Sequence, residues 1–153
     1  MRLSAHFTLK EFTDSDTALR LGIDNILPDV LLHEAEATAD MLERIRAYLG
    51  DCAGHEVRID ITSGYRCAAL NTAVGSKPTS DHIKALAADF KAPVFGTALE
   101  VCKALAPAVD VLGIGQLIHE HAWIHVSRRR PEKDSNRLLT VNGSGYVPGI
   151  MEA

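Results

Sequence analysis

Hydrophobic residues recur at three- and four-residue spacing in the first third of the chain, which is the pattern of amphipathic helices. The longest such stretch opens at Pro28 and Asp29, runs to about Leu49 and stops at Gly50. Its apolar positions are Val30, Leu31, Ala35, Ala39, Leu42, Ile45 and Leu49. We therefore predict one long helix that packs one face on a core.

Capping signals predict shorter helices. A Thr followed three residues later by Glu is a capping box, in which each residue satisfies a free donor of the helix start. This pattern occurs at Thr8 and again at Thr97, where the helix runs to about Leu105. Residues 14–22 read as another short helix that ends in Gly22, and residues 66–74 can form one more.

Strand patterns follow the long helix. Val57, Ile59 and Ile61 alternate with polar residues up to Ser63 and Gly64, as in a half-buried strand. Further strands are expected at residues 87–91, 113–119 and 122–127, and a loop at residues 75–80. Because helices gather early and strands late with short links, we predict an α+β fold with a small, mainly antiparallel sheet and helices packed on it.

Composition narrows the class of protein. A chain of 153 residues with 46% apolar and 24% charged residues suits one globular domain over residues 1–153. The formal net charge of −4 argues against a nucleic-acid binder, which normally carries a basic face. No apolar run approaches the roughly 18 residues that span a bilayer, so we expect no membrane insertion. No secretory signal is visible at the start, and we expect synthesis in the cytoplasm.

The three cysteines are widely spaced and form no C-x-x-C pair. They read as buried or idle thiols of a protein made in a reducing compartment, with a Cys52–Cys67 bridge as the alternative. Arg128–Arg130 is a basic run, which we interpret as a solvated face. The other interpretation of this run is attraction of an anionic ligand.

Candidate chemistry lies in two segments. His82 and Asp89 stand seven residues apart across a loop that leads into a strand, and strand alternation puts His125 on one face with Trp123 and Ser127. Two His and one carboxylate suit a catalytic Zn²⁺, which keeps a fourth position for water and lowers the pKa of that water to roughly 7. On spacing alone, the competing interpretation is an ordinary loop histidine, a solvated carboxylate and a core histidine.

The segment Ser80-x-His82-x-x-Ala85-x-Ala87-x-Asp89 resembles the S-x-H-x-x-G-x-A-x-D signature of the zinc DD-peptidase family, the M15 peptidases. That family includes D-Ala-D-Ala carboxypeptidases and phage endolysins that cut peptidoglycan. Other stretches resemble the family in the same order: Phe7–Phe12 with Ser15–Ala18 and Gly22–Asn25 (the phage-type subgroup), Ser63–Arg66 with Leu70–Asn71, and Gln116–Glu120 leading into Trp123–Ser127.

The resemblance implies a hedgehog/DD-peptidase-like fold and a role for each matching residue. His82, Asp89 and His125 would ligate Zn²⁺. Arg66 would hold the scissile carbonyl or a substrate carboxylate, and Ser80 would help to bind substrate; the plainer alternatives are a surface arginine and an ordinary loop serine. Within the domain we expect a helical part over about 8–50, a metal-site core over about 57–127 and an irregular tail over 128–153.

The general base is implied less directly. Some relatives carry an acid three residues before the last His ligand, where this chain has Ala122, and others carry one five residues before it, where it has Glu120. We predict Glu120 as the base, with His119 and His121 as alternatives. Ala85 replaces the signature Gly; if that position has a positive φ, Ala costs about 1 kcal/mol there.

The resemblance therefore implies a zinc metallopeptidase that hydrolyses peptidoglycan stem peptides as a D,D-carboxypeptidase or an endolysin-type endopeptidase. We expect a phage or prophage product, a monomer, that acts on the wall after release at lysis or from the virion. One alternative is a non-catalytic zinc-binding structural or wall-binding module of the same fold. A purely structural zinc domain is a weaker alternative, because such sites usually close all four positions, often with Cys.

Overall fold

The computed structural model describes residues 1–153. The helices predicted for the first third of the chain are its first elements. Helix α1 spans Leu9–Thr13, α2 Asp16–Leu21, the 3₁₀ turn η1 Asp29–Leu31 and α3 Leu32–Ala53. The capping box at Thr8 is formed, because its side chain accepts from the Glu11 amide while the Glu11 carboxylate accepts from the Thr8 amide. Gly22 ends α2 with φ 67°, a left-handed conformation that suits glycine.

The long helix ends later than its sequence pattern predicts. Gly50 lies inside α3, and the helix stops at Gly54, whose φ is 76° and whose amide donates to the Gly50 carbonyl. Both glycines stand near the end of the apolar stripe, and only the second takes the left-handed conformation that closes a helix. The predicted apolar face is buried except at its start, where Val30 is exposed and Leu31 half-buried.

A six-stranded sheet forms the centre of the molecule, in the order β1-β2-β4-β3-β5-β6. Every neighbouring pair is antiparallel except β3 with β5, which is parallel. The α+β architecture is therefore confirmed. The strands are β1 Asp60–Ser63, β2 Ala87–Lys91, β3 Gln116–Glu120, β4 Trp123–Ser127, β5 Leu138–Asn142 and β6 Gly145–Pro148.

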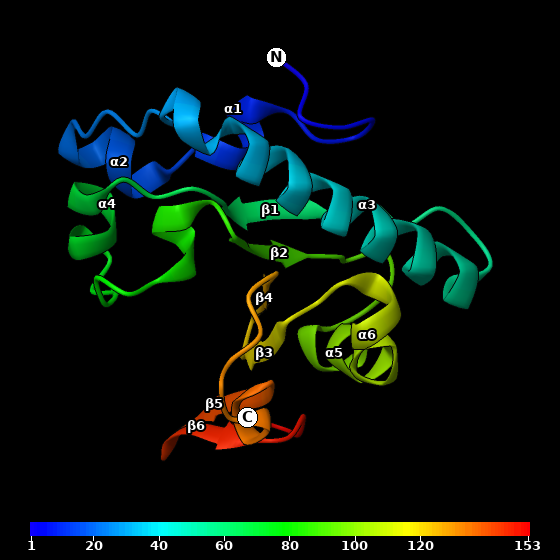
Figure 1. The fold of residues 1–153 in the computed structure, drawn as a ribbon. Coiled ribbons are helices and arrows are strands. Elements are labelled where there is room, and N and C mark those ends of the chain that lie inside the picture. Colours follow the sequence, from blue (N-terminus) through cyan, green and yellow to red (C-terminus); the bar gives the residue numbers. More distant parts are fainter.

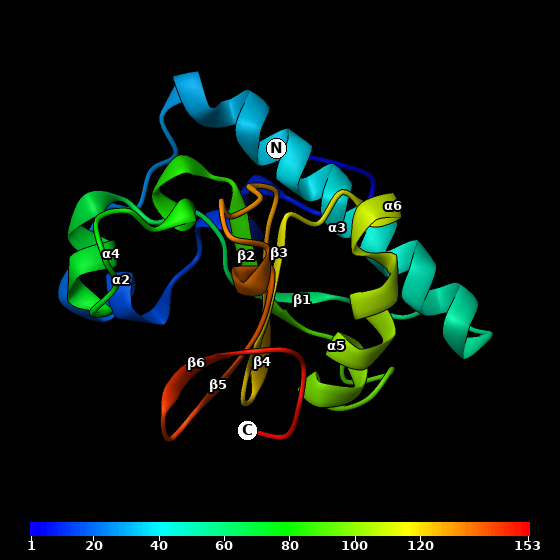
Figure 2. The ribbon, with the colours of Figure 1, turned by 60° about the horizontal axis from the view of Figure 1, so that its bottom comes forward.

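Short helices connect these strands. They are α4 Ala68–Ala73, η2 Asp81–Lys84, α5 Ala98–Leu105, η3 Ala106–Ala108, α6 Val109–Leu112 and η4 Asp134–Asn136. The second predicted capping box, at Thr97 and Glu100, opens α5. Figure 2 shows α5 and α6 on one side of the sheet, together with α3, and α2 and α4 on the other.

Strand alternation divides the sheet into a core face and an open face. The alternate residues Phe90, Ile124, Val126 and Leu117 are nearly or fully buried in the hydrophobic core, which α3 and α5 help to form. The residues between them in sequence, Asp89 and His125 among others, point to the opposite face. Figure 1 shows this second face lying between α2 and α4 at one end and the β5–β6 hairpin at the other.

The C-terminal segment corrects two expectations. Residues 128–153 are not an irregular tail, because β5 and β6 form a hairpin that extends the sheet. The basic run is not simply a solvated face: Arg128 contacts Glu34 and Thr38 on α3, and Arg129 contacts Asp81. Arg129 and Arg130 nevertheless have exposed side chains, as expected, and Arg130 forms an exposed pair with Asp134.

All three cysteines are free thiols. Cys52 is exposed, Cys67 half-buried and Cys102 buried, and burial raises the pKa of Cys102 to about 12. The Cys52–Cys67 bridge is therefore absent. None of the helices combines the length and the apolar character that crossing a membrane requires.

Candidate metal centre

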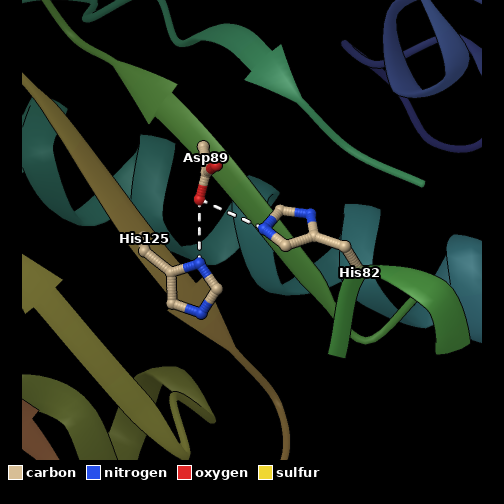
Figure 3. A group of neighbouring side chains, drawn as sticks. All are labelled: His82, Asp89 and His125. Carbon is tan, nitrogen blue, oxygen red and sulfur yellow. Dashed lines mark hydrogen bonds and ion pairs between the residues drawn. The ribbon is translucent and has the colours of Figure 1, made fainter. Parts of the chain in front are cut away.

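Three side chains with metal-binding atoms converge on the open face of the sheet. Asp89 on β2 stands directly opposite His125 on β4, and His82 reaches them from η2 (Figure 3). Asp89 Oδ1 lies 2.8 Å from His125 Nδ1 and 3.3 Å from His82 Nε2. One ligand atom from each residue lies within 4.8 Å of the other two, and all three residues are buried or nearly so. This is the set of residues that the sequence predicts as ligands.

The ring of His82 is held in one tautomer. Its Nδ1–H donates to the Gly64 carbonyl oxygen over 2.6 Å, so the neutral imidazole has its lone pair on Nε2. That lone pair faces the Asp89 carboxylate, and two acceptors facing each other repel unless a proton or a cation lies between them. A hydrogen bond from the other ring nitrogen to a carbonyl is the usual way in which a metal-ligating His is oriented.

Asp89 and His125 form a strongly polarised pair. Burial alone would raise the pKa of Asp89, but the neighbouring imidazoles of His82 and His125 outweigh it and lower that pKa well below its usual value. Burial would lower the pKa of His125, but the hydrogen bond and charge of Asp89 raise it. The site therefore holds a carboxylate that stays ionised and favours a positive charge between the two imidazoles.

Asp81, next to the first ligand, fastens η2 to β4. Its carboxylate is buried, and it accepts a hydrogen bond of 2.8 Å from the Ser127 hydroxyl and one of 2.7 Å from Arg129 Nε. Ser127 lies two residues after His125 on the same face of β4. The Asp81 contacts thus tie the loop that carries one ligand to the strand that carries another.

Ala85 stands at the position where the family signature has Gly, and its backbone is left-handed. Its φ is 58° and its ψ 23°, so this position does take the left-handed conformation for which the signature has Gly. The Ala85 methyl is buried, and the Ala85 carbonyl accepts a hydrogen bond of 2.6 Å from the buried Thr38 hydroxyl. Tertiary contacts therefore hold the strained residue, and the three ligands still converge.

Arg66 lies beside Asp89 with part of its hydrogen-bonding capacity unused. Its guanidinium donates to Ser63 Oγ over 3.1 Å, to Asn71 Oδ1 over 3.4 Å and to Asp89 Oδ2 over 3.3 Å. Burial lowers its pKa, while the charges of Asp89 and Glu120 oppose that shift. Three of the five N–H donors of an arginine are thus engaged, and two remain for another ligand.

Glu120 shares the open face with the ligand set. It ends β3 and pairs with Trp123, and its neighbour Ile118 pairs with His125. Burial and the charge of Asp89 raise the pKa of Glu120, while His125 and Arg66 act in the opposite direction. A half-buried carboxyl with a raised pKa, close to the ligands, has the properties of a general base.

Of the alternative bases, His119 points the wrong way. It alternates with Glu120 along β3, so it lies on the core face, where it is buried and its Nδ1–H donates to the Met151 carbonyl. His121 lies in the exposed turn after β3, with φ 69°. Ala122, the position of the missing acid, is in the same turn.

A cleft of about 340 Å³ opens beside the ligands. Its walls come from α2, β1 and α4, and Arg66, Asp89 and Trp123 lie where it meets the site; the lining residues are Ser15, Asp16, Thr17, Thr62, Ser63, Arg66, Leu70, Val74, Asp89 and Trp123. Ser80 does not line this cleft. Its hydroxyl accepts a hydrogen bond from the His82 amide and so caps η2, and its predicted contact with substrate stays a prediction.

Two asparagines support the site, and the sequence predicted no role for either of them. Asn25 donates to the Thr13 and Tyr65 carbonyls and accepts from the Cys67 amide, so it joins the α1–α2 region to the segment around Arg66. Asn71 is buried, accepts from Arg66 and donates to the Lys77 carbonyl. Both stand in segments that resemble the family, and that resemblance was the only available signal.

The donor set fits a zinc ion. Two imidazoles and one carboxylate are the ligands of several catalytic zinc sites, which leave a fourth position open. The fixed tautomer of His82 and the ionised Asp89 present unprotonated ligand atoms, as metal binding requires. No cysteine belongs to the group, which distinguishes it from most closed structural zinc sites.

Comparison with known proteins agrees with this geometry. A search of curated proteins found no match for the chain. The family profile described as Peptidase M15 matches residues 5–127, which include the three candidate ligands, Arg66 and Glu120. With most of its length matched, this chain belongs to the peptidase M15 family.

Proposed function

We propose that this chain is a zinc-dependent peptidase that hydrolyses peptide bonds in peptidoglycan stem peptides. The observation that carries the proposal is the convergence of His82 Nε2, Asp89 Oδ1 and His125 Nδ1 beside a half-buried carboxyl and a cleft. Membership of the M15 peptidases supports a hydrolytic reaction. A zinc ion held by the three ligands would polarise the scissile carbonyl and lower the pKa of the attacking water.

Glu120 would move the protons of this reaction. Its carboxylate takes a proton from the attacking water, and the resulting carboxylic acid returns that proton to the amine released when the C–N bond breaks. A base works best when its pKa approaches the working pH, and burial next to Asp89 moves the pKa of Glu120 in that direction.

Arg66 would hold the oxygen of the scissile carbonyl. Ser63, Asn71 and Asp89 fix its guanidinium, which leaves two N–H donors and a permanent positive charge for the developing oxyanion. Because the side chain is already ordered, little conformational entropy is lost when the substrate binds.

The cleft beside Arg66 would accept part of the substrate. Leu70, Val74 and Trp123 give it apolar walls, and its volume of about 340 Å³ suits a short peptide segment. We propose a D,D-carboxypeptidase or an endolysin-type endopeptidase. The resemblance of the opening segment to the phage-type subgroup supports a phage or prophage origin, with action on the cell wall at lysis or from the virion.

The test is digestion of purified peptidoglycan by zinc-loaded protein, with the released fragments identified by mass spectrometry. We expect defined peptides that disappear after chelation and return with zinc. Glu120→Gln keeps the shape of the side chain and should lower the rate roughly 10²- to 10⁴-fold while zinc stays bound. Glu56→Gln is the matched control, because that carboxyl is highly exposed and lies outside the site.

Release of peptides that does not depend on metal would contradict the zinc mechanism. Full activity of Glu120→Gln would remove Glu120 as the base. If the protein binds one equivalent of zinc and releases nothing from several wall types, the non-catalytic module becomes the better description.

A further inference from the structure

The β5–β6 hairpin extends the same face of the sheet that carries the metal ligands. Ile118 on β3 stands opposite both His125 on β4 and Leu139 on β5, so these side chains share one face. Continuing the parallel register by two residues puts Glu120 beside Val141, and Val141 pairs with Tyr146 on β6. Glu120, Val141 and Tyr146 therefore form one row across the open face. The hairpin lies beyond the residues that the family profile matches.

The hairpin is fixed to the body of the protein. The Thr140 hydroxyl donates to the Gly149 carbonyl over 2.8 Å and accepts from the Met151 amide over 3.0 Å. The Met151 carbonyl in turn accepts from His119 Nδ1 over 2.9 Å. These bonds tie the segment after β6 to both β5 and β3, so the position of Tyr146 is set by the sheet and not by a free tail.

Tyr146 lies at the edge of the sheet, on the face that carries the ligand set. Adjacent strands are about 4.8 Å apart, so two strand steps separate the backbones of Tyr146 and Glu120 by about 10 Å, and only Val141 stands between them. Burial and the negative charges of Glu120 and Asp89 raise the pKa of Tyr146. The phenol is therefore a protonated hydrogen-bond donor at neutral pH.

The hydroxyl of Tyr146 has no hydrogen-bond partner within the chain, and the residue is 62% exposed. The other two tyrosines differ: Tyr65 is buried, and the Tyr48 hydroxyl donates to the Ala104 carbonyl far from the site. An exposed aromatic donor held beside a reaction centre can both pack against a ligand and hydrogen-bond to it.

We propose that Tyr146 is a substrate-binding residue whose hydroxyl donates a hydrogen bond to a carbonyl oxygen of the stem peptide. The cleft around Arg66 and Trp123 lies on the β2 side of the ligands, and Tyr146 lies on the β6 side. The peptide therefore crosses the metal centre from the cleft to the hairpin, with Arg66 and Tyr146 on opposite flanks. This inference rests on the proposed peptidase function, and it adds a contact from outside the family-matched region.

The test compares Tyr146→Phe with wild type in two measurements. The first is kcat/KM on a soluble stem peptide, and the second is the affinity of metal-stripped protein for that peptide, followed by fluorescence. Trp123 is the only tryptophan and lies in the cleft, so it reports binding without turnover. Loss of one neutral hydrogen bond should lower kcat/KM and the affinity about 3- to 10-fold. Tyr146→Ala should lower both further, because the ring contact is also lost.

Tyr48→Phe is the matched control and should leave both measurements unchanged. Zinc content and Tm should be the same in Tyr146→Phe as in wild type, because the lost hydroxyl has no partner in the chain. Unchanged kcat/KM and affinity in Tyr146→Phe, with an active wild type, would overturn this inference and leave the peptidase function standing. A zinc-loaded wild type that neither binds nor cleaves stem peptides would overturn the proposed function and this inference with it.

Discussion

The three candidate metal ligands of this protein are held in two different ways. Asp89 and His125 lie on neighbouring strands, where the register of the sheet places them directly opposite each other. His82 lies on η2, a single turn, and is positioned by contacts from several distant segments. Among these are the Gly64 carbonyl, the contacts of Asp81 with β4, and the bond from Thr38 to Ala85.

The difference shows what each kind of support requires. A strand ligand is fixed by backbone hydrogen bonds and by alternation, which any sequence with the right pattern provides. A loop ligand has no ladder to hold it, so each anchor must be a specific side chain or carbonyl. We therefore expect substitutions near η2 to affect the metal site more than equivalent substitutions in the strands.

Ligand removal is expected to have the largest effect. His82→Ala and His125→Ala should each weaken zinc binding about a hundredfold or more, because each removes one of three protein ligands. Zinc affinity is measured by competition with a chromophoric chelator. The two variants should differ in amide exchange of the metal-free proteins, since only His82→Ala also removes the bond to Gly64. Equal exchange over residues 81–86 in the two variants would show that the loop around His82 does not depend on the bond to Gly64.

Gly64→Ala should destabilise the fold by about 2–3 kcal/mol and lower Tm by roughly 5–10 °C. A Cβ at this position would lie 2.3 Å from the Phe12 carbonyl oxygen, so the backbone that orients His82 must shift. We expect both the Tm, measured by thermal unfolding, and the zinc affinity to fall. Gly143→Ala is the control, because its Cβ would meet open space; a similar loss of Tm there would argue against the steric explanation.

Asp81→Asn should lower the free energy of unfolding by about 1–2 kcal/mol, because it removes the charge from a buried carboxylate that accepts a hydrogen bond from Arg129. Asp134→Asn removes the same type of charge from the exposed pair with Arg130 and should cost less than about 0.5 kcal/mol. Chemical denaturation of both variants measures the difference. If the two costs were equal, Asp81 would not anchor the loop.

Ala85→Gly is expected to have the smallest effect: its free energy of unfolding should stay within about 0.5 kcal/mol of the wild-type value. Relief of the left-handed strain, up to about 1 kcal/mol, offsets the loss of a buried methyl group worth about 0.8 kcal/mol. Ala88→Gly in β2 has no strain to relieve and should cost about 1–2 kcal/mol. A large loss in Ala85→Gly, measured by denaturant unfolding, would mean that the methyl contact dominates.

Local sequence patterns were enough to predict most of the helices and strands. Capping residues at Thr8 and Thr97 start helices through contacts within one turn, and alternation marks β2 and β4 because the pleat has a period of two. The candidate ligands and Glu120 were predicted from the resemblance to a family of known chemistry, and the structure brings His82, Asp89 and His125 together.

The long-range partners of these elements could not be predicted from local patterns and are known from the folded structure. Arg128 and Arg129 bind the carboxylates of Glu34 and Asp81, and residues 138–148 join the sheet through a parallel pair with β3. Each outcome depends on groups far apart in sequence, such as Asp81 with Arg129 and His82 with Gly64. Local patterns report hydrophobicity and backbone preference, and they contain no information on which distant donor will satisfy a buried acceptor.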